Sequence, residues 1–177
     1  MHTLVIYESM YGNTRSIAEA VADSLRAEGE VRVTAVRDAD DVAVAWADLV
    51  IVGGPTHIHG MTRASTRKTA SDRAAEPGSE LTLEPEAIGP GIRDWLGTVG
   101  KVQDKRAAAF DTRAGGPSLF TGAASGGIAS GLRGRGFKLV AKPESFLVDK
   151  QSALVAGELD RAARWGAGLA GLLVPAR

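Results

Sequence analysis

The chain has 177 residues, of which 44% are hydrophobic, with 21 basic and 21 acidic residues and no cysteine. This length and apolar content suit a single domain with a packed core, and the balanced charge offers no general basic field for nucleic acid. The absence of cysteine excludes disulfides, thiolate catalysis and cysteine-ligated metal. No apolar run approaches the roughly 20 residues of a membrane span, and the chain starts directly with a predicted strand. We therefore expect a soluble cytoplasmic protein without membrane or nucleic-acid partners.

The first thirty residues predict a strand, a polar loop and a helix. Residues 4–6 form an apolar run without alternation, as in a strand buried on both faces. Apolar residues recur at helical spacing over residues 17–25, and Gly29 suits a helix end. The loop between them, residues 9–14, directs N–H groups and hydroxyls toward a helix N-terminus, where the dipole favours an anion. It contains no lysine, so it suits a phosphate monoester held by hydrogen bonds; the alternative is an ordinary turn in which Ser9 and Asn13 cap the helix.

Further strands and helices alternate along the rest of the chain. Residues 31–36 alternate imperfectly and predict an edge strand, whereas residues 49–52 and 107–110 predict buried central strands. A fifth strand is predicted over residues 138–141 and 145–148, split around Pro143. Helical spacing is found over residues 38–46, 92–99, 124–132 and 155–172. This alternation predicts an α/β fold with a five-stranded parallel sheet in the order 2-1-3-4-5 and helices on both faces.

Two more polar loops follow the predicted central strands, at residues 53–61 and 111–117. In a doubly wound sheet the carboxyl ends of central strands meet where ligands bind. His57 and His59, two residues apart, are conceivable metal ligands, but no neighbouring residues complete a site. We therefore expect no metal and no separate catalytic residue.

Residues 62–91 are the least regular part of the chain. They are polar and basic at first and then rich in Pro, Gly and Glu, which predicts a polar loop insertion within one domain spanning residues 1–177. The basic residues Arg63, Arg67, Lys68 and Arg73 either meet an anionic partner or belong to a solvated excursion. Because the segment has few apolar residues, we expect it to contribute little to the core.

The loop at residues 9–14 resembles the phosphate-binding loop of flavodoxins, Thr/Ser-x-Thr-Gly-Asn-Thr. The match lies at Ser9, Gly12, Asn13 and Thr14, with Tyr11 where threonine is usual, and the Gly-Pro-Thr at residues 54–56 is a second match. The resemblance implies a flavodoxin-like fold and one non-covalently bound FMN, with its phosphate on residues 9–14 and its ring between the loops starting at Pro55 and Asp111. It also implies that the backbone beside Gly60 turns toward N5 of the ring.

The cofactor-binding residues that this resemblance implies fall in three groups, one from each loop. They are Ser9, Met10, Tyr11, Gly12, Asn13 and Thr14; Pro55, Thr56, His57, Ile58, His59 and Gly60; and Asp111, Thr112, Arg113 and Gly116.

Three functions are compatible with these features. The first is an electron carrier that passes electrons between redox partner proteins, as a monomer or weak homodimer. The second is an FMN-dependent oxidoreductase of the quinone reductase or protoporphyrinogen oxidase type, which the neutral net charge and the insertion favour. The third is a flavodoxin-like module without flavin, which the intact residues of the first loop disfavour. A carrier demands the fewest features, so we expect a carrier.

Overall fold

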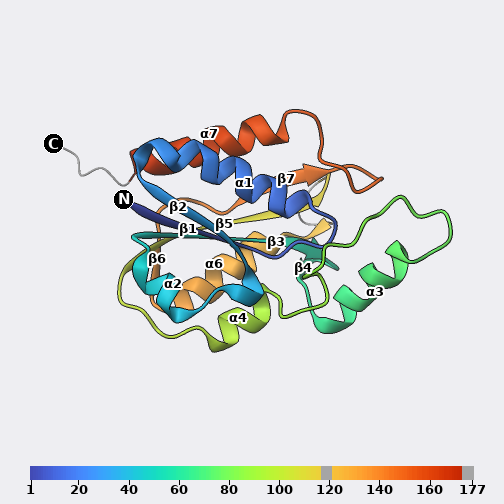
Figure 1. The fold of residues 1–177 in the computed structure, drawn as a ribbon, viewed down its shortest axis with the longest axis horizontal. Helices are drawn as coiled ribbons and strands as arrows, with labels where there is room; N and C mark the ends of the chain where they lie inside the picture. Colours follow the sequence, from blue (N-terminus) through green and yellow to red (C-terminus); the bar gives the residue numbers. More distant parts are fainter. Residues whose placement is uncertain (117–120, 173–177) are drawn as a thin grey trace.

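A computed structural model describes residues 1–116 and 121–172, and Pro117, the last residue of the third loop, lies outside them. A parallel sheet in the order β2-β1-β3-β5-β6 forms the centre of the molecule (Figure 1). Two further strands extend it, β4 beside β3 and β7 beside β5. The strands are β1 (His2–Tyr7), β2 (Glu30–Ala35), β3 (Leu49–His57), β4 (Gly60–Met61), β5 (Lys105–Ala114), β6 (Phe137–Leu139) and β7 (Glu144–Val148).

This topology confirms the predicted strand order 2-1-3-4-5, because β6 and β7 are the two parts of the predicted fifth strand. Both parts pair in parallel with β5, at opposite ends of it. The strand is interrupted between these two parts around Pro143, because proline has no N–H to donate to the hydrogen bonds of a sheet. Residues 149–152 directly follow β7 and therefore lie at the carboxyl end of the sheet.

Helices cover both faces of the sheet (Figure 1). Helices α1 and α7 lie together on one face, and α2, α4 and α6 lie on the other. Successive residues of β1 divide between the two sides, with Leu4 and Ile6 in one apolar core and Val5 and Tyr7 in the other. The helices, with the 3-10 turns η1 and η2, are α1 (Asn13–Leu25), η1 (Arg26–Glu28), η2 (Val36–Asp38), α2 (Asp41–Trp46), α3 (Ala64–Ala74), α4 (Ile92–Thr98), α6 (Ala124–Gly134) and α7 (Glu158–Gly171).

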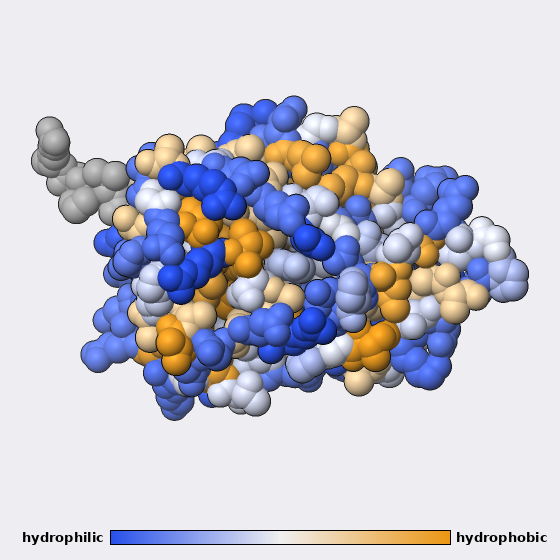
Figure 2. Space-filling view, viewed as in Figure 1, coloured by the Kyte–Doolittle hydropathy of each residue, from blue (hydrophilic) through white to orange (hydrophobic). Residues whose placement is uncertain are grey.

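The expectation that residues 62–91 form an irregular loop is wrong for residues 64–74, which form α3. The Thr66 hydroxyl accepts the Arg63 N–H at 2.9 Å and so closes the first turn of this helix. The segment projects from the carboxyl end of the sheet beside β4 (Figure 1). In Figure 2 its outer end is mostly hydrophilic, and hydrophobic atoms gather where it joins the body of the molecule.

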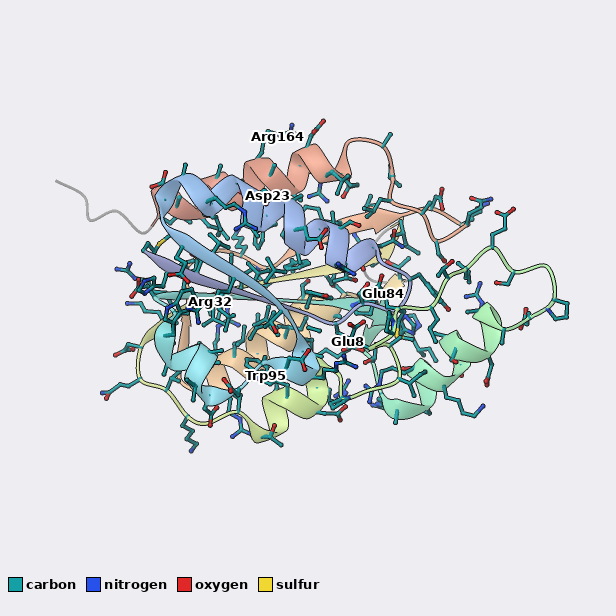
Figure 3. All side chains as sticks on the ribbon, in the orientation of Figure 1. Glu8, Asp23, Arg32, Glu84, Trp95 and Arg164 are labelled. Atoms are coloured by element: carbon teal, nitrogen blue, oxygen red, sulfur yellow. The ribbon has the colours of Figure 1, made fainter. Side chains whose placement is uncertain are left out.

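The segment is also fixed to the core, contrary to the sequence-based expectation. Arg67 is buried, with its guanidinium donating to the Thr62 hydroxyl at 3.0 Å and to the Asp94 carboxylate at 2.8 Å. The Thr62 hydroxyl in turn donates to the carboxylate of Glu8, which also accepts the Ile92 N–H at 2.8 Å. Figure 3 shows Glu8 between the sheet and the projecting segment. Sequence patterning missed this anchor because it is polar.

Burial raises the pKa of Glu8. Three groups oppose this shift and so stabilise the buried carboxylate. The Thr62 hydroxyl, the Ile92 N–H and the charge of Arg67 all favour the carboxylate. Glu8 directly precedes the loop at residues 9–14, so the network joins that loop to α3 and α4.

We expect Arg67→Leu to lower the free energy of unfolding by about 2–4 kcal/mol, because it leaves the buried Glu8 carboxylate without its nearest cation. Lys68→Leu, one residue along the same helix, removes only an exposed ion pair with Asp72 and should change the free energy of unfolding by less than about 1 kcal/mol. Urea unfolding of both variants measures the difference. Equal effects would contradict an anchoring role for Arg67.

Candidate functional site

A pocket of about 400 Å³ opens at the carboxyl end of the central strands. Its volume lies within the range of small-molecule sites. Residues from all three predicted loops line it, together with one face of α3 and the loop that follows β7. The register explains this meeting, because β1, β3 and β5 are parallel neighbours and end at the same edge.

The loop at residues 9–14 leaves the start of α1 available to a ligand. Gly12 has φ +89°, a conformation that glycine adopts readily, and its N–H donates to the Ser9 hydroxyl at 3.1 Å. Helix α1 begins at Asn13 and has no side-chain cap. The N–H groups of its first turn have no acceptor within the helix, so they can bind an anion.

Two side chains of this loop connect it to neighbouring segments. The Thr14 and Thr112 hydroxyls form a buried hydrogen bond of 2.7 Å, which joins the first loop to the third. The Asn13 amide donates to the Ser152 carbonyl at 2.6 Å. The loop at residues 9–14 is therefore fixed by hydrogen bonds to two neighbouring segments.

The second loop is a tight hairpin turn between β3 and β4. His57 pairs with Gly60, so Ile58 and His59 alone form the turn. Their φ angles are +46° and +69°. Two central residues with positive φ define a type I′ turn, which normally contains asparagine and glycine. A β-branched residue in this conformation is strained, and Ile58 is also 80% exposed while lining the pocket.

The third loop contributes Thr112 and Arg113 to the pocket, whereas Asp111 faces away from it. The Asp111 carboxylate is buried and accepts from the Thr56 hydroxyl at 3.1 Å and from the Ser125 N–H at 2.7 Å. It does not pair with Arg113, whose guanidinium donates to the Gly116 carbonyl at 2.8 Å and to the Thr121 hydroxyl at 2.9 Å. Asp111 thus positions the second loop and the start of α6.

The structure brings most of the sequence-predicted site residues together. Those that line the pocket are Ser9, Met10, Tyr11, Asn13, Thr14, Pro55, Thr56, His57, Ile58, Thr112 and Arg113. Those that do not line it are Gly12, His59, Gly60, Asp111 and Gly116. A cofactor-binding role for each residue stays a prediction.

Sequence reasoning missed two groups of lining residues. The first is a face of α3, Thr66, Thr69, Ala70 and Arg73, whose spacing of three, one and three residues is the helical signal that was available. The second lies at the ends of β5 and β7 and just after β7, and comprises Ala114, Val148, Asp149, Lys150 and Ser152. No local motif marks this second group, which reaches the pocket only through the register of β7 on β5.

Charge in the pocket is mainly positive. Arg73, Arg113 and Lys150 line it, against one acidic lining residue, Asp149. Burial lowers the pKa of His57, a backbone hydrogen bond with Thr66 opposes this, and the charge of Arg73 adds to the lowering. His57 is therefore neutral near pH 7 and presents an uncharged ring.

Within residues 1–116 and 121–172, no group of three or more His, Asp or Glu is placed to hold a metal ion. None of the helices in these ranges is both long enough and apolar enough to cross a membrane.

Comparison with known proteins connects this geometry to one family. A family model described as a flavodoxin domain matches residues 4–68. A flavodoxin from Aquifex aeolicus (strain VF5) is 47% identical over 57 residues, which cover 31% of this chain and 31% of that protein. The match with this relative therefore spans less than half of its length.

Solved structures resemble the chain over nearly its whole length. Flavodoxin 1 from Bacillus cereus aligns with a TM-score of 0.67 and 19% identity, over 98% of this chain and 100% of that one. A flavodoxin from the domain Archaea aligns with a TM-score of 0.63 and 20% identity, over 97% of each chain. These comparisons and the sheet order confirm the predicted resemblance: the chain has a flavodoxin-like α/β fold.

We expect Ile58→Asn to raise the free energy of unfolding by about 1 kcal/mol, because asparagine tolerates the positive φ that strains a β-branched side chain. Ile88→Asn is the matched control, since Ile88 is also exposed but has no positive φ. Thermal and urea unfolding of the ligand-free variants measure the change. A loss of stability in Ile58→Asn would show that the turn is not strained.

Proposed function

We propose that the pocket binds one FMN without a covalent link and that the protein transfers electrons to and from a redox partner protein. The observation that carries this proposal is the uncapped start of α1 behind the Gly12 turn, opening into a pocket of about 400 Å³. The flavodoxin-type sequence of residues 4–68 supports it.

The donor chemistry of the pocket fits FMN. The first-turn N–H groups of α1 and the hydroxyls of Ser9 and Thr14 would hold the phosphate. Residues 55–58 and 112–114 come from adjacent strands and would face the flavin ring from two sides. The Tyr11 hydroxyl would not donate to the phosphate, because it donates to the Ala70 carbonyl at 2.8 Å.

FMN would supply the redox chemistry when bound, and the protein would supply binding, orientation and electrostatics. The exposed side chain of Ile58 at the pocket entrance leaves an apolar edge through which a partner can approach. His57 is the described lining residue whose ordinary pKa lies nearest neutrality, and its burial disfavours the charged form. An electron carrier of this kind would need contact with a partner protein and no proton transfer to a bound substrate.

We expect Thr14→Val to weaken FMN binding by about one to two powers of ten, because it removes one donor to the phosphate dianion. Riboflavin, which lacks the phosphate, should bind the variant and the unaltered protein alike. Thr112→Val is the control, because it breaks the same hydroxyl pair and leaves the loop hydroxyl in place. Fluorescence titration of the apoprotein gives all the affinities, and equal losses for FMN and riboflavin would exclude a phosphate at Thr14.

The carrier role makes a separate prediction. Under anaerobic conditions, NADH or NADPH should bleach the FMN-loaded protein slowly, with or without a benzoquinone, whereas dithionite should reduce it stepwise. Rapid bleaching with catalytic quinone turnover would establish an oxidoreductase in place of a carrier.

A further inference from the structure

Three cationic side chains line the pocket without an acidic partner, Arg73, Arg113 and Lys150, and of these the Arg113 guanidinium is already hydrogen-bonded to the Gly116 carbonyl and the Thr121 hydroxyl. Within the described residues, neither Arg73 nor Lys150 makes an ion pair. Other basic residues near this edge are engaged: Arg67 pairs with Asp94 and Arg15 with Glu19. The positive charges of Arg73 and Lys150 are therefore available to a ligand.

Arg73 belongs to α3, which is hydrogen-bonded to the loop at residues 9–14. The Tyr11 hydroxyl donates to the Ala70 carbonyl at 2.8 Å, and Tyr11 lies within residues 9–14. Ala70 precedes Arg73 by three residues, so both lie on the same face of α3. Tyr11 and Ala70 also share a small apolar cluster with Met10 and Ala87. The first loop and the face of α3 that carries Arg73 thus form one packed unit.

Lys150 reaches the pocket from the other side through an independent connection. The Asn13 amide donates to the Ser152 carbonyl at 2.6 Å, which ties residues 149–152 to the first turn of α1. The Asp149 carboxylate fixes this turn by accepting the N–H groups of Gln151 and Ala153, each at 2.9 Å. Two neighbouring residues of the same loop, Tyr11 and Asn13, therefore each hold a segment that carries a cation.

Two acidic groups lie near the loop: Asp149, which lines the pocket and accepts the N–H groups of Gln151 and Ala153, and Glu84, which pairs with Arg15. Glu84 lies beside Gly12, with a carboxylate oxygen 3.5 Å from the guanidinium of Arg15. Figure 3 shows Glu84 at the base of the projecting segment. Glu84 is not among the pocket-lining residues. The charge of Arg73 lowers the pKa of Tyr11 against the larger effect of burial, which places that charge within range of the loop.

We propose that Arg73 and Lys150 form a cationic clamp on the phosphate dianion bound at residues 9–14. The loop itself has no charged donor, so the clamp supplies the charge from α3 and from the turn after β7. It makes the insertion part of the ligand site, and it favours phosphorylated flavin over riboflavin. The proposal rests on the proposed function for the identity of the ligand, but not for its phosphate chemistry.

The test uses apoprotein and three probes: FMN, riboflavin and inorganic phosphate. The variants are Arg73→Gln, Lys150→Gln and the double variant, with Arg73→Lys as the charge-conserving change. Lys101→Gln is the matched control, because Lys101 is exposed and outside the pocket. Binding is measured by flavin fluorescence for the flavins and by phosphorus NMR for phosphate, at about 20 mM and about 500 mM salt.

Each single variant should weaken FMN binding by about threefold to tenfold, a moderate effect because both side chains are exposed and solvent screens them. Riboflavin affinity should change less than about twofold, and Arg73→Lys should retain most of the FMN affinity. The salt dependence of FMN binding should be smaller in the double variant, because fewer charges take part. Lys101→Gln should behave like the unaltered protein.

Unchanged FMN affinity in the double variant, or equal losses for FMN and riboflavin, would overturn the clamp. Phosphate binding that is lost in the double variant, without any FMN binding by the unaltered protein, would support the clamp and overturn the proposed function. Failure of the unaltered protein to bind FMN and phosphate would overturn both.

Discussion

The site depends on the register in which three parallel strands end together. Tyr7 pairs with Gly53 and Gly53 with Phe110, so β1, β3 and β5 reach the same level before their loops begin. Gly53 permits this register, because a Cβ at that position would lie 2.0 Å from the Phe110 ring. That ring is held by edge-to-face contacts with Phe146 and Trp165, at centroid distances of 6.0 and 6.1 Å.

Polar interactions then fix the loops that the register has brought together. The buried Glu8 carboxylate joins the end of β1 to Thr62 and to the start of α4. The Asp111 carboxylate does the same between Thr56 and the start of α6. Each carboxylate receives donors from two other segments, which offsets the cost of removing its charge from water. The strained turn at Ile58 is sustained by this surrounding structure.

The sequence predicts the sheet and the three polar loops at the ends of its central strands because apolar runs and loop chemistry are local signals. Residues 4–6, 49–52 and 107–110 are buried strands as expected, and the polar residues after them converge on the pocket. The inward orientation of Asp111 could not be predicted, since its donors come from Thr56 and Ser125, which are distant in the sequence.

Helix α3 was missed for a different physical reason. Its inner face consists of the Arg67 anchor and of the polar residues that line the pocket, so it lacks the apolar stripe by which a surface helix is recognised. A guanidinium that pairs inside the protein and one that faces a ligand are indistinguishable in sequence. The difference between Arg67 and Arg73 therefore appears only in the structure.

The central claim is that one FMN occupies the pocket where these loops meet, and hydrogen–deuterium exchange with and without FMN tests it most directly. The account predicts slower exchange on FMN binding in residues 9–14, 55–60, 66–73, 111–114 and 149–152, with little change in α7, which contributes no residue to the pocket lining. No protection, or protection confined to other segments, would contradict it.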